Sequence, residues 1–226
     1  MRSTLNSIII TGAGLLLATA AEAAGFDCSK ASRADEKIVC EDSELSRLDE
    51  LFNERYAAQK RTSTGDDLVH TARNFLADRR DCGSDRSCIL SAYLAVLWTI
   101  SADKSDFMGG ISAKSLAGNR SPEAKAIPAK VGQCAATSIV EVHPRLDGDA
   151  DFDSGTGVDY ANDGYQVSYR REEALIGSKP GDQVTMCLVQ IDRDCSPGES
   201  GRLFLVTNDR TRESWILPDA QHKCGG

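Results

Sequence analysis

Eight cysteines constrain this chain more than any other feature of its sequence. They form two groups of four, Cys28, Cys40, Cys82 and Cys88 followed by Cys134, Cys187, Cys195 and Cys224. None of them makes a Cys-x-x-Cys pair and no histidine lies at zinc-finger spacing from them, which disfavours a structural zinc site and a thioredoxin-like redox centre. An even number of cysteines in an exported chain predicts a disulfide framework.

The first residues have the pattern of an export signal, which we predict to span residues 1–23. Met1-Arg2 gives a positive start, Ile8 to Ala21 is mostly apolar, and Ala21-Glu22-Ala23 fits a small-x-small cleavage site. The apolar run is too short and too interrupted for a membrane span. Cys28 lacks the small preceding residues that lipid attachment requires. We expect a periplasmic or secreted bacterial protein with a Sec-type signal and no membrane anchor after cleavage.

The charge of the chain restricts its partners. The formal net charge is −8, and nucleic-acid phosphates require clustered Lys and Arg, so a nucleic-acid partner is disfavoured. An acidic surface is compatible with a basic protein partner, although a simply solvated surface has the same composition.

Composition divides the mature chain into two parts. Residues 101–130 are rich in Ser, Ala, Gly and Lys and contain Pro122 and Pro128, which is typical of a linker. We therefore predict one domain over residues 24–100 and a second over residues 131–226.

The first part has the periodicity of helices. Apolar residues recur at helical spacing in two stretches, Leu45 to Tyr56 and Leu68 to Arg79, and Cys88 to Ile100 is apolar on most sides. Gly83 follows the second stretch, and the third should be the most buried helix. Short connections favour antiparallel neighbours. On that basis we pair Cys40 with Cys82 and Cys28 with Cys88, although four cysteines allow three connectivities.

The second part has the pattern of short strands. Residues 135–142, 165–170, 184–189, 203–207 and 214–217 are rich in β-branched or alternating residues, and the turn signals Lys179–Asp182 and Asn208–Thr211 lie between them. A small antiparallel barrel or sandwich with two disulfides accommodates such strands. The predicted fold class is therefore α+β in two domains, an all-α bundle or hairpin followed by a β-domain.

A set of short motifs lies in order along residues 26–100. They are Phe26-Asp27-Cys28-Ser29-Lys30-Ala31, Glu36-Lys37-Ile38-Val39-Cys40, Leu48-Asp49-Glu50-Leu51, Tyr56, Arg79-Arg80-Asp81-Cys82, Cys88-Ile89 and Tyr93. This pattern resembles the lysozyme inhibitor LprI family. The family's Gln-x-x-Trp is replaced here by Ala72-x-x-Phe75. The resemblance implies an all-α, disulfide-stapled domain and a protein that binds and blocks lysozyme.

The loop between Cys82 and Cys88 is the first candidate for partner binding. Its residues Ser84, Asp85 and Arg86 are polar, and a rigid loop loses little entropy when it enters a cleft. The alternative is a plain connection between two helices whose polar residues face water.

An acidic segment is the second candidate for partner binding. Residues 147–163 carry six Asp and no Lys or Arg, and four of these residues, Asp147, Asp149, Asp151 and Asp153, alternate along the chain. Such charge can steer the approach of a basic lysozyme. A calcium loop of the EF-hand type would need Gly at its sixth position and Glu at its twelfth. From Asp147 those positions are Phe152 and Val158, so we predict no metal.

The sequence indicates no catalytic residues. His70, His143 and His222 are scattered singly, without a nucleophile motif or ligand spacing. Our first hypothesis is an exported, non-catalytic protein that occludes the cleft of a lysozyme and needs no cofactor. The alternative is a structural or cell-envelope interaction module without inhibitory activity. An enzyme acting on the cell wall would require a pocket with paired carboxylates.

Overall fold

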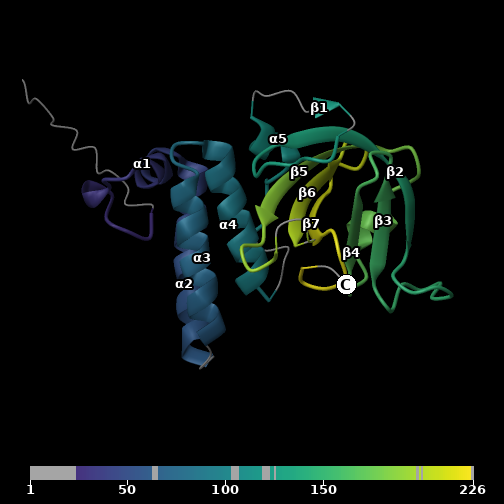
Figure 1. Cartoon of the computed structure of the whole chain (residues 1–226), viewed down its shortest axis with the longest axis horizontal. Coiled ribbons are helices and arrows are strands. Elements are labelled where there is room, and N and C mark those ends of the chain that lie inside the picture. The colour runs from purple at the N-terminus through teal and green to yellow at the C-terminus, as the bar shows by residue number, and fades with distance from the viewer. Residues whose placement is uncertain are drawn as a thin grey trace, which may run out of the picture.

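The computed structural model of the chain describes residues 24–62, 66–102, 107–118, 123–124, 126–196, 199 and 201–224. The predicted signal peptide, residues 1–23, lies outside the described residues. Helices make up the N-terminal half and a curled antiparallel sheet makes up the C-terminal half (Figure 1). The predicted α+β class is confirmed.

The helical half consists of a short 3-10 turn and four helices, which are η1 (Cys28–Lys30), α1 (Ala34–Glu41), α2 (Ser43–Thr62), α3 (Asp66–Asp81) and α4 (Arg86–Ile100). Asp42 sets the start of α2, because its carboxylate accepts the backbone N–H groups of Glu44 and Leu45 at 3.0 Å each. Gly83 takes a φ of +57° directly after α3, a conformation that favours glycine and ends the helix. Within the described residues, no helix has the length and hydropathy to cross a membrane.

The sheet half contains six antiparallel strands in the order β4-β3-β2-β5-β6-β7. Their bounds are β2 (Cys134–Pro144), β3 (Thr156–Tyr160), β4 (Tyr165–Ser168), β5 (Gln183–Ile191), β6 (Arg202–Asn208) and β7 (Ser214–Pro218). Three short elements accompany them: α5 (Ala113–Ala117), β1 (Glu123–Ala124), which pairs parallel to β2, and α6 (Glu173–Ile176). All five predicted strands are present, and β3 is an additional one.

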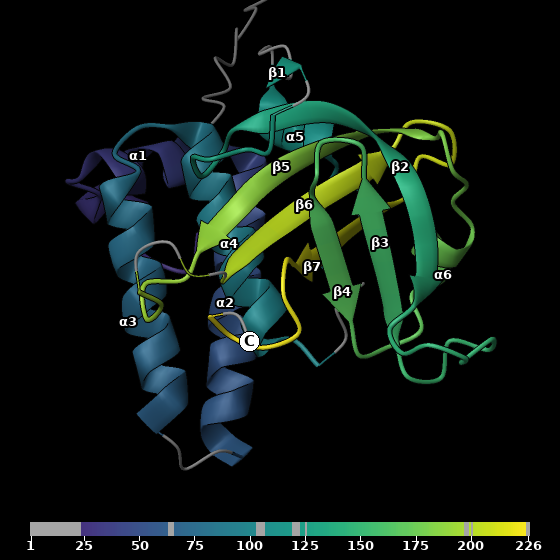
Figure 2. The same ribbon diagram turned by 45° about the vertical axis from the view of Figure 1, so that its right-hand side comes forward.

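The sheet curls into a half-barrel, so that its edge strands β4 and β7 approach each other (Figure 2). The fully buried side chain of Gln166 in β4 spans the remaining gap. Its amide donates to the backbone oxygens of Phe204 and Leu217 at 2.9 Å each. Inside the half-barrel, Trp215 and Tyr160 donate to the Gln166 side-chain oxygen at 3.0 and 2.6 Å. Every polar group of this amide therefore has a partner, as burial requires.

All eight cysteines are paired, as the sequence predicts, in the disulfides Cys28–Cys40, Cys82–Cys88, Cys134–Cys187 and Cys195–Cys224. The four bonds indicate an oxidising compartment, extracellular or periplasmic.

The predicted pairing of Cys40 with Cys82 and of Cys28 with Cys88 is wrong. The chain folds back between η1 and α1, which places the Cα atoms of Cys28 and Cys40 5.9 Å apart. A tight turn places Cys82 directly beside Cys88, in the first turn of α4, with their Cα atoms 5.4 Å apart. Both bonds therefore close local loops instead of joining distant helices.

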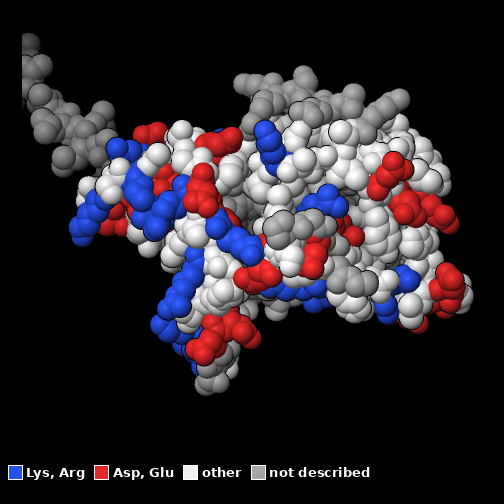
Figure 3. Space-filling model, in the orientation of Figure 1, with Lys and Arg blue, Asp and Glu red and all other residues white. Residues whose placement is uncertain are grey.

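Charge is distributed unevenly over the surface. In Figure 3, Lys and Arg gather over the helical half, where they mix with Asp and Glu, whereas the far end of the sheet half shows mainly Asp and Glu.

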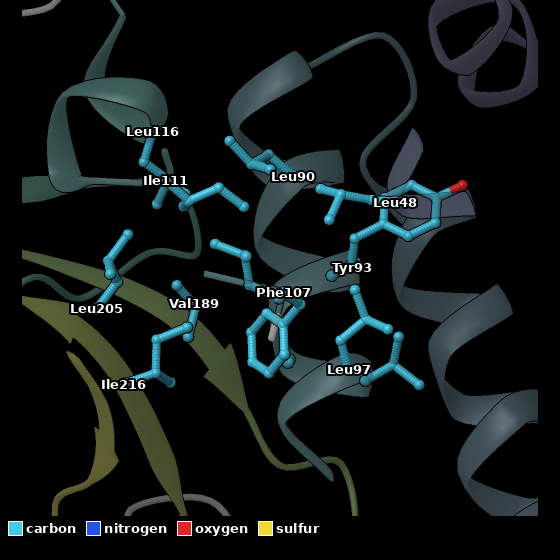
Figure 4. Packing of buried hydrophobic residues seen from close by; sticks show 14 of the residues in the cluster. Leu48, Leu90, Tyr93, Leu97, Phe107, Ile111, Leu116, Val189, Leu205 and Ile216 are labelled. Carbon is cyan, nitrogen blue, oxygen red and sulfur yellow. The ribbon is translucent and has the colours of Figure 1, made fainter. Parts of the chain in front are cut away.

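Helix α4 lies between the other helices and the outer face of the sheet. Figure 4 shows Leu90 and Leu97 of α4 within one cluster that also holds Val189, Leu205 and Ile216 of the sheet. Alternate residues of the same strands point inward to a second cluster, within the half-barrel. Because α4 is apolar on nearly every side, it can be buried between two layers. The helices and the sheet therefore share one core.

The stretch predicted as a linker contributes to this shared core. Phe107, Ile111 and Leu116 are each at most 3% exposed and belong to the same cluster as α4. The turn of α5 that carries Leu116 packs between α4 and the start of the sheet.

Candidate functional site

Three residues of the short motifs in residues 26–100, Asp49, Arg79 and Tyr93, meet Asp35 in a buried ionic network. Arg79 of α3 donates to Asp35 of α1 at 3.0 Å and to Asp49 of α2 at 3.2 Å. It also donates to the Tyr93 hydroxyl of α4 at 2.9 Å, and this hydroxyl donates to Asp49 at 2.7 Å. Each of these four residues is at most 4% exposed. One guanidinium thus joins all four helices of the N-terminal half.

Two cations offset the two buried carboxylates of the network, because Arg33 also bonds to Asp35. Burial opposes the charge of Arg79, yet contacts with Tyr93, Asp49 and Asp35 hold the pKa of the guanidinium above its usual value. Burial also works against the charge of Asp35, but hydrogen bonds from Arg33 and Arg79 outweigh it and lower the pKa of that carboxyl. Burial, reinforced by Asp49, raises the pKa of Tyr93. These four buried residues therefore organise the helices and are not available to a partner.

The predicted loop between α3 and α4 is closed by the Cys82–Cys88 disulfide. Backbone bonds from Gly83 to Arg80 at 3.1 Å and from Asp85 to Cys82 at 3.0 Å fix its path. The Asp85 carboxylate caps α4, because it accepts the N–H groups of Ser87 and Cys88 at 2.9 and 3.2 Å. Ser84 and Asp85 are exposed, and Ser84 has no side-chain partner among the described residues. The loop is a rigid turn with a small polar tip.

Arg86, the third predicted residue of this loop, is engaged within the chain. Its guanidinium donates to Asp42 and Glu44 at 2.7 Å each and to the backbone oxygen of Ser115 at 3.0 Å. Arg86 thereby ties the start of α4 to α2 and α5. These contacts hold the end of the loop against α2 and α5. A contact between Arg86 and a partner stays a prediction.

The chain also packs against the base of the loop from the sheet side. The Ser87 hydroxyl donates to the backbone oxygen of Leu116 at 2.6 Å. Gly132 has a φ of +82°, and a Cβ there would lie 3.1 Å from the Cys88 nitrogen. Only glycine suits both conditions without strain. The loop is therefore held on its inner side, and its tip faces solvent.

The predicted acidic residues lie in the connection between β2 and β3. Asp149 organises this connection, because its carboxylate accepts the Ser154 hydroxyl and N–H at 2.6 Å each and the Asp153 N–H at 3.1 Å. These hydrogen bonds, from Ser154 first, lower the pKa of Asp149. Asp147, Asp151 and Asp153 are exposed. Asp149 is thus structural, and its three neighbours present negative charge to solvent.

The two predicted binding regions do not form one surface. The α3–α4 turn lies in the helical half, whereas the β2–β3 connection projects from the far end of the sheet (Figures 1 and 2). A partner that contacts the tip of the α3–α4 turn would interact with the β2–β3 connection only through long-range electrostatics.

The structure does not bring the three histidines together. His70 lies 3.1 Å from Asp194, His143 lies 3.5 Å from Asp159, and His222 lies 3.5 Å from the Tyr169 hydroxyl. In the part of the chain that the structure describes, no three His, Cys, Asp or Glu side chains are grouped as metal ligands would be. Of the aromatic residues of the sheet, Tyr160 and Trp215 belong to the core, and Tyr169 is exposed.

One feature that sequence reasoning missed is a groove of about 880 Å³ between the two halves. Helices α3 and α4 form one wall, and β4, β7 and the C-terminal segment form the other. Its lining comes from stretches that are far apart in the sequence, so no local motif marks it.

Comparisons with protein-family models, with curated proteins and with solved structures give no match to this chain.

Proposed function

We propose that this protein is an exported, non-catalytic binding protein that inhibits a lysozyme by occupying its cleft. The observation that supports this proposal is the disulfide-closed turn at Cys82–Cys88, with Ser84 and Asp85 exposed at its tip. It lies within the stretch that resembles the LprI family, and that resemblance supplies the choice of partner.

The turn has the physical properties of an inserting loop. The disulfide, the Asp85 cap and the contacts of Arg86 all restrict it before any partner arrives. Ordering a side-chain-rich loop on binding typically costs about 0.5–1.5 kcal/mol per immobilised side chain. A turn that is already ordered avoids most of this loss, and its short polar side chains suit a narrow, hydrated cleft.

The acidic connection between β2 and β3 contributes by long-range attraction. Asp147, Asp151 and Asp153 are exposed, and the whole chain carries a net charge of −8. Charge of this kind raises the association rate with a basic partner more than it tightens the contact. Inhibition should therefore begin more slowly at high salt, because the Debye length is about 8 Å at 0.15 M and about 3 Å at 1 M.

The direct test is the hydrolysis of peptidoglycan by several lysozyme types in the presence of the purified, oxidised protein. A Ser84→Arg variant places a bulky side chain at the tip of the turn and should weaken inhibition at least about tenfold, or ~1.4 kcal/mol, without changing the unfolding midpoint. Ala57→Arg, at an exposed position on α2, is the matched control and should inhibit like the unmodified protein. The absence of inhibition at micromolar excess against every lysozyme type would refute the proposal.

A second function is favoured by exposed apolar side chains on the sheet half. Val140, Leu146 and Tyr169 are 50–52% exposed, which suits a structural or cell-envelope interaction module. In that case, Val140→Asp together with Tyr169→Ala should abolish sedimentation of the protein with isolated cell envelopes. The same double variant should inhibit lysozyme normally if the α3–α4 turn is the inhibitory element.

A further inference from the structure

The groove between the halves has an apolar floor built largely from small side chains. Ala92, Ala95 and Val96 line it from α4, and Leu203 and Ile216 line it from the sheet. Alanine side chains end at Cβ, so these positions leave the space that a larger residue would fill. Elsewhere along α4, Leu90 and Leu97 close the same interface completely. The groove therefore exists because α4 carries small side chains where it faces this part of the sheet.

The rim of the groove is predominantly acidic. Six carboxylates line it, namely Asp67, Asp78, Glu172, Asp192, Asp194 and Asp219, against the three cations Arg170, Arg202 and Lys223. Two of these cations are already engaged, Arg202 with Asp219 at 2.6 Å and Lys223 with Asp194 at 2.9 Å. In the part of the chain that is described, Asp67 is exposed and has no counter-ion. The lining thus has an excess of negative charge.

Asp78 is a rim carboxylate whose negative charge is disfavoured by its burial, although Arg193 is paired with it. Burial raises its pKa, and although Arg193 bonds to it, Asp81 and Asp192 repel its charge. Arg193 is also shared with Asp81. A second cation beside Asp78 would offset this unfavourable burial of negative charge.

The mouth of the groove is fixed before any ligand binds. The Cys195–Cys224 disulfide joins the β5–β6 connection to the C-terminal segment. Asp194 of that connection also contacts His70 of α3 at 3.1 Å, and Arg193 bonds to two carboxylates of the same helix. These contacts cross from one wall to the other, so the two walls are held at a defined distance.

We propose that the groove binds a small amphipathic cation, with an apolar body against the alanine-lined wall of α4 and an ammonium or guanidinium group toward Asp78. A volume of about 880 Å³ lies within the range of about 300–1,000 Å³ that small-molecule sites occupy, and such sites combine an apolar lining with a few charged groups. This site is separate from the Cys82–Cys88 turn and does not depend on lysozyme inhibition.

The test uses the full chain and three probes with ten-carbon chains, each below its critical micelle concentration. Decyltrimethylammonium is the cation, decyl maltoside is the neutral probe and decanoate is the anion, with binding measured by isothermal titration calorimetry. The cation should bind at least about tenfold more tightly than the anion, because the charge contact lies in a partly desolvated rim. Equal affinity for cation and anion would overturn the proposal, as would the absence of binding by all three probes.

Variants separate the two parts of the site. Asp78→Asn should weaken binding of the cation about tenfold and leave the other probes unchanged, since Arg193 keeps its contact with Asp81. Asp147→Asn makes the same charge change on the distant acidic connection and should have no effect. Ala95→Phe fills the groove and should reduce binding of all three probes. Thr71→Phe, on α3 in the same wall, should have the same effect without altering α4. Unchanged cation binding by Asp78→Asn would contradict the assignment.

The outcome is distinguishable from a failure of the proposed inhibitory function. Thr71→Phe should still inhibit lysozyme, because Thr71 lies in α3 eleven positions before Cys82, about three helical turns from the Cys82–Cys88 turn. If the protein inhibits lysozyme but does not bind the cation, only the groove proposal is refuted. If it binds the cation but does not inhibit, only the inhibitory function is refuted.

Discussion

At the scale of single residues, Arg79 is the side chain on which the helical half most depends. Replacing it with Met should destabilise the protein by about 3–5 kcal/mol, because the carboxylate of Asp49 would remain buried without its cation and Asp35 would keep only its bond to Arg33. Urea denaturation followed by circular dichroism measures this loss. Arg80→Met, at the adjacent exposed position, should change stability by no more than about 0.5 kcal/mol. Similar effects of the two substitutions would contradict the structural role of the network.

A second prediction at this scale concerns acid sensitivity. Hydrogen bonds from Lys223 and His70 lower the pKa of Asp194 from 3.8 to about 2. A carboxyl with a lowered folded-state pKa stabilises the fold above its unfolded pKa, and this stabilisation is lost as the pH falls toward the folded value. The free energy of unfolding should therefore decrease between pH 3.8 and about 2, and less steeply in Asp194→Asn.

The control for this pH profile is the Asp147→Asn variant. The Asp147 carboxyl is exposed and lies far from the contacts of Asp194 with Lys223 and His70. In this control the free energy of unfolding should fall with decreasing pH as steeply as in the unmodified protein over the same pH interval. If Asp194→Asn and the unmodified protein lose stability in parallel, the contacts of Asp194 with Lys223 and His70 do not stabilise the fold.

Residue-level features were predictable from the sequence where their causes are local. Gly83 ends a helix and Asp42 caps one through contacts within three residues, so composition and spacing indicate them. The Arg79 network joins residues up to 44 positions apart. Nothing in the neighbourhood of Asp35 or Asp49 reveals that one guanidinium bonds to both.

At the scale of elements, the disulfides should differ in what they contribute. Loop-closure entropy predicts about 2 kcal/mol for a bond that closes a short loop and about 4 kcal/mol for one that closes a loop of about 50 residues. Cys82–Cys88 spans 6 positions and Cys134–Cys187 spans 53. Paired Cys→Ala substitution should therefore destabilise the protein more at Cys134–Cys187, as measured by thermal unfolding of each variant. Equal losses would show that native-state contacts outweigh chain entropy.

The variant that lacks Cys82 and Cys88 also tests the turn as a binding element. Without Cys82–Cys88 the helices should persist, since the Asp85 cap and the Arg86 contacts remain. Lysozyme inhibition should then weaken through lost preorganisation. Full inhibition by the Cys82→Ala, Cys88→Ala protein would show that the rigidity of the turn is irrelevant.

Element-level predictions succeeded where one periodicity dominated. Five strands followed from alternation and β-branched residues, but β3 is buried at four of its five positions and follows an Asp-rich run, so no alternation marks it. The wrong cysteine pairing has a different cause. It assumed that helix packing brings Cys40 to Cys82, whereas tight local folding satisfies each cysteine first.

At the scale of the whole molecule, the groove could not be predicted because stretches far apart in the sequence form it. Its walls come from α3, from α4, from β4 with α6, and from the region between β5 and the C-terminal segment. Their relative placement depends on how α4 packs on the outer face of the sheet. The apolar character of α4 indicates that it is buried on two sides, but not which elements cover it.

The shared core predicts that the two halves unfold together. The cluster that contains α4 also contains side chains from β5, β6 and β7, so separating the halves would expose apolar surface on both. The chain has two tryptophans, Trp98 in α4 and Trp215 in the half-barrel core. In a Trp215→Phe variant the remaining fluorescence reports α4, and in Trp98→Phe it reports the sheet. Each fluorescence transition in urea should coincide with the circular dichroism transition of the same variant. Two separated midpoints would mean that the helices fold without the sheet, and that the interface which forms the groove adds little to stability.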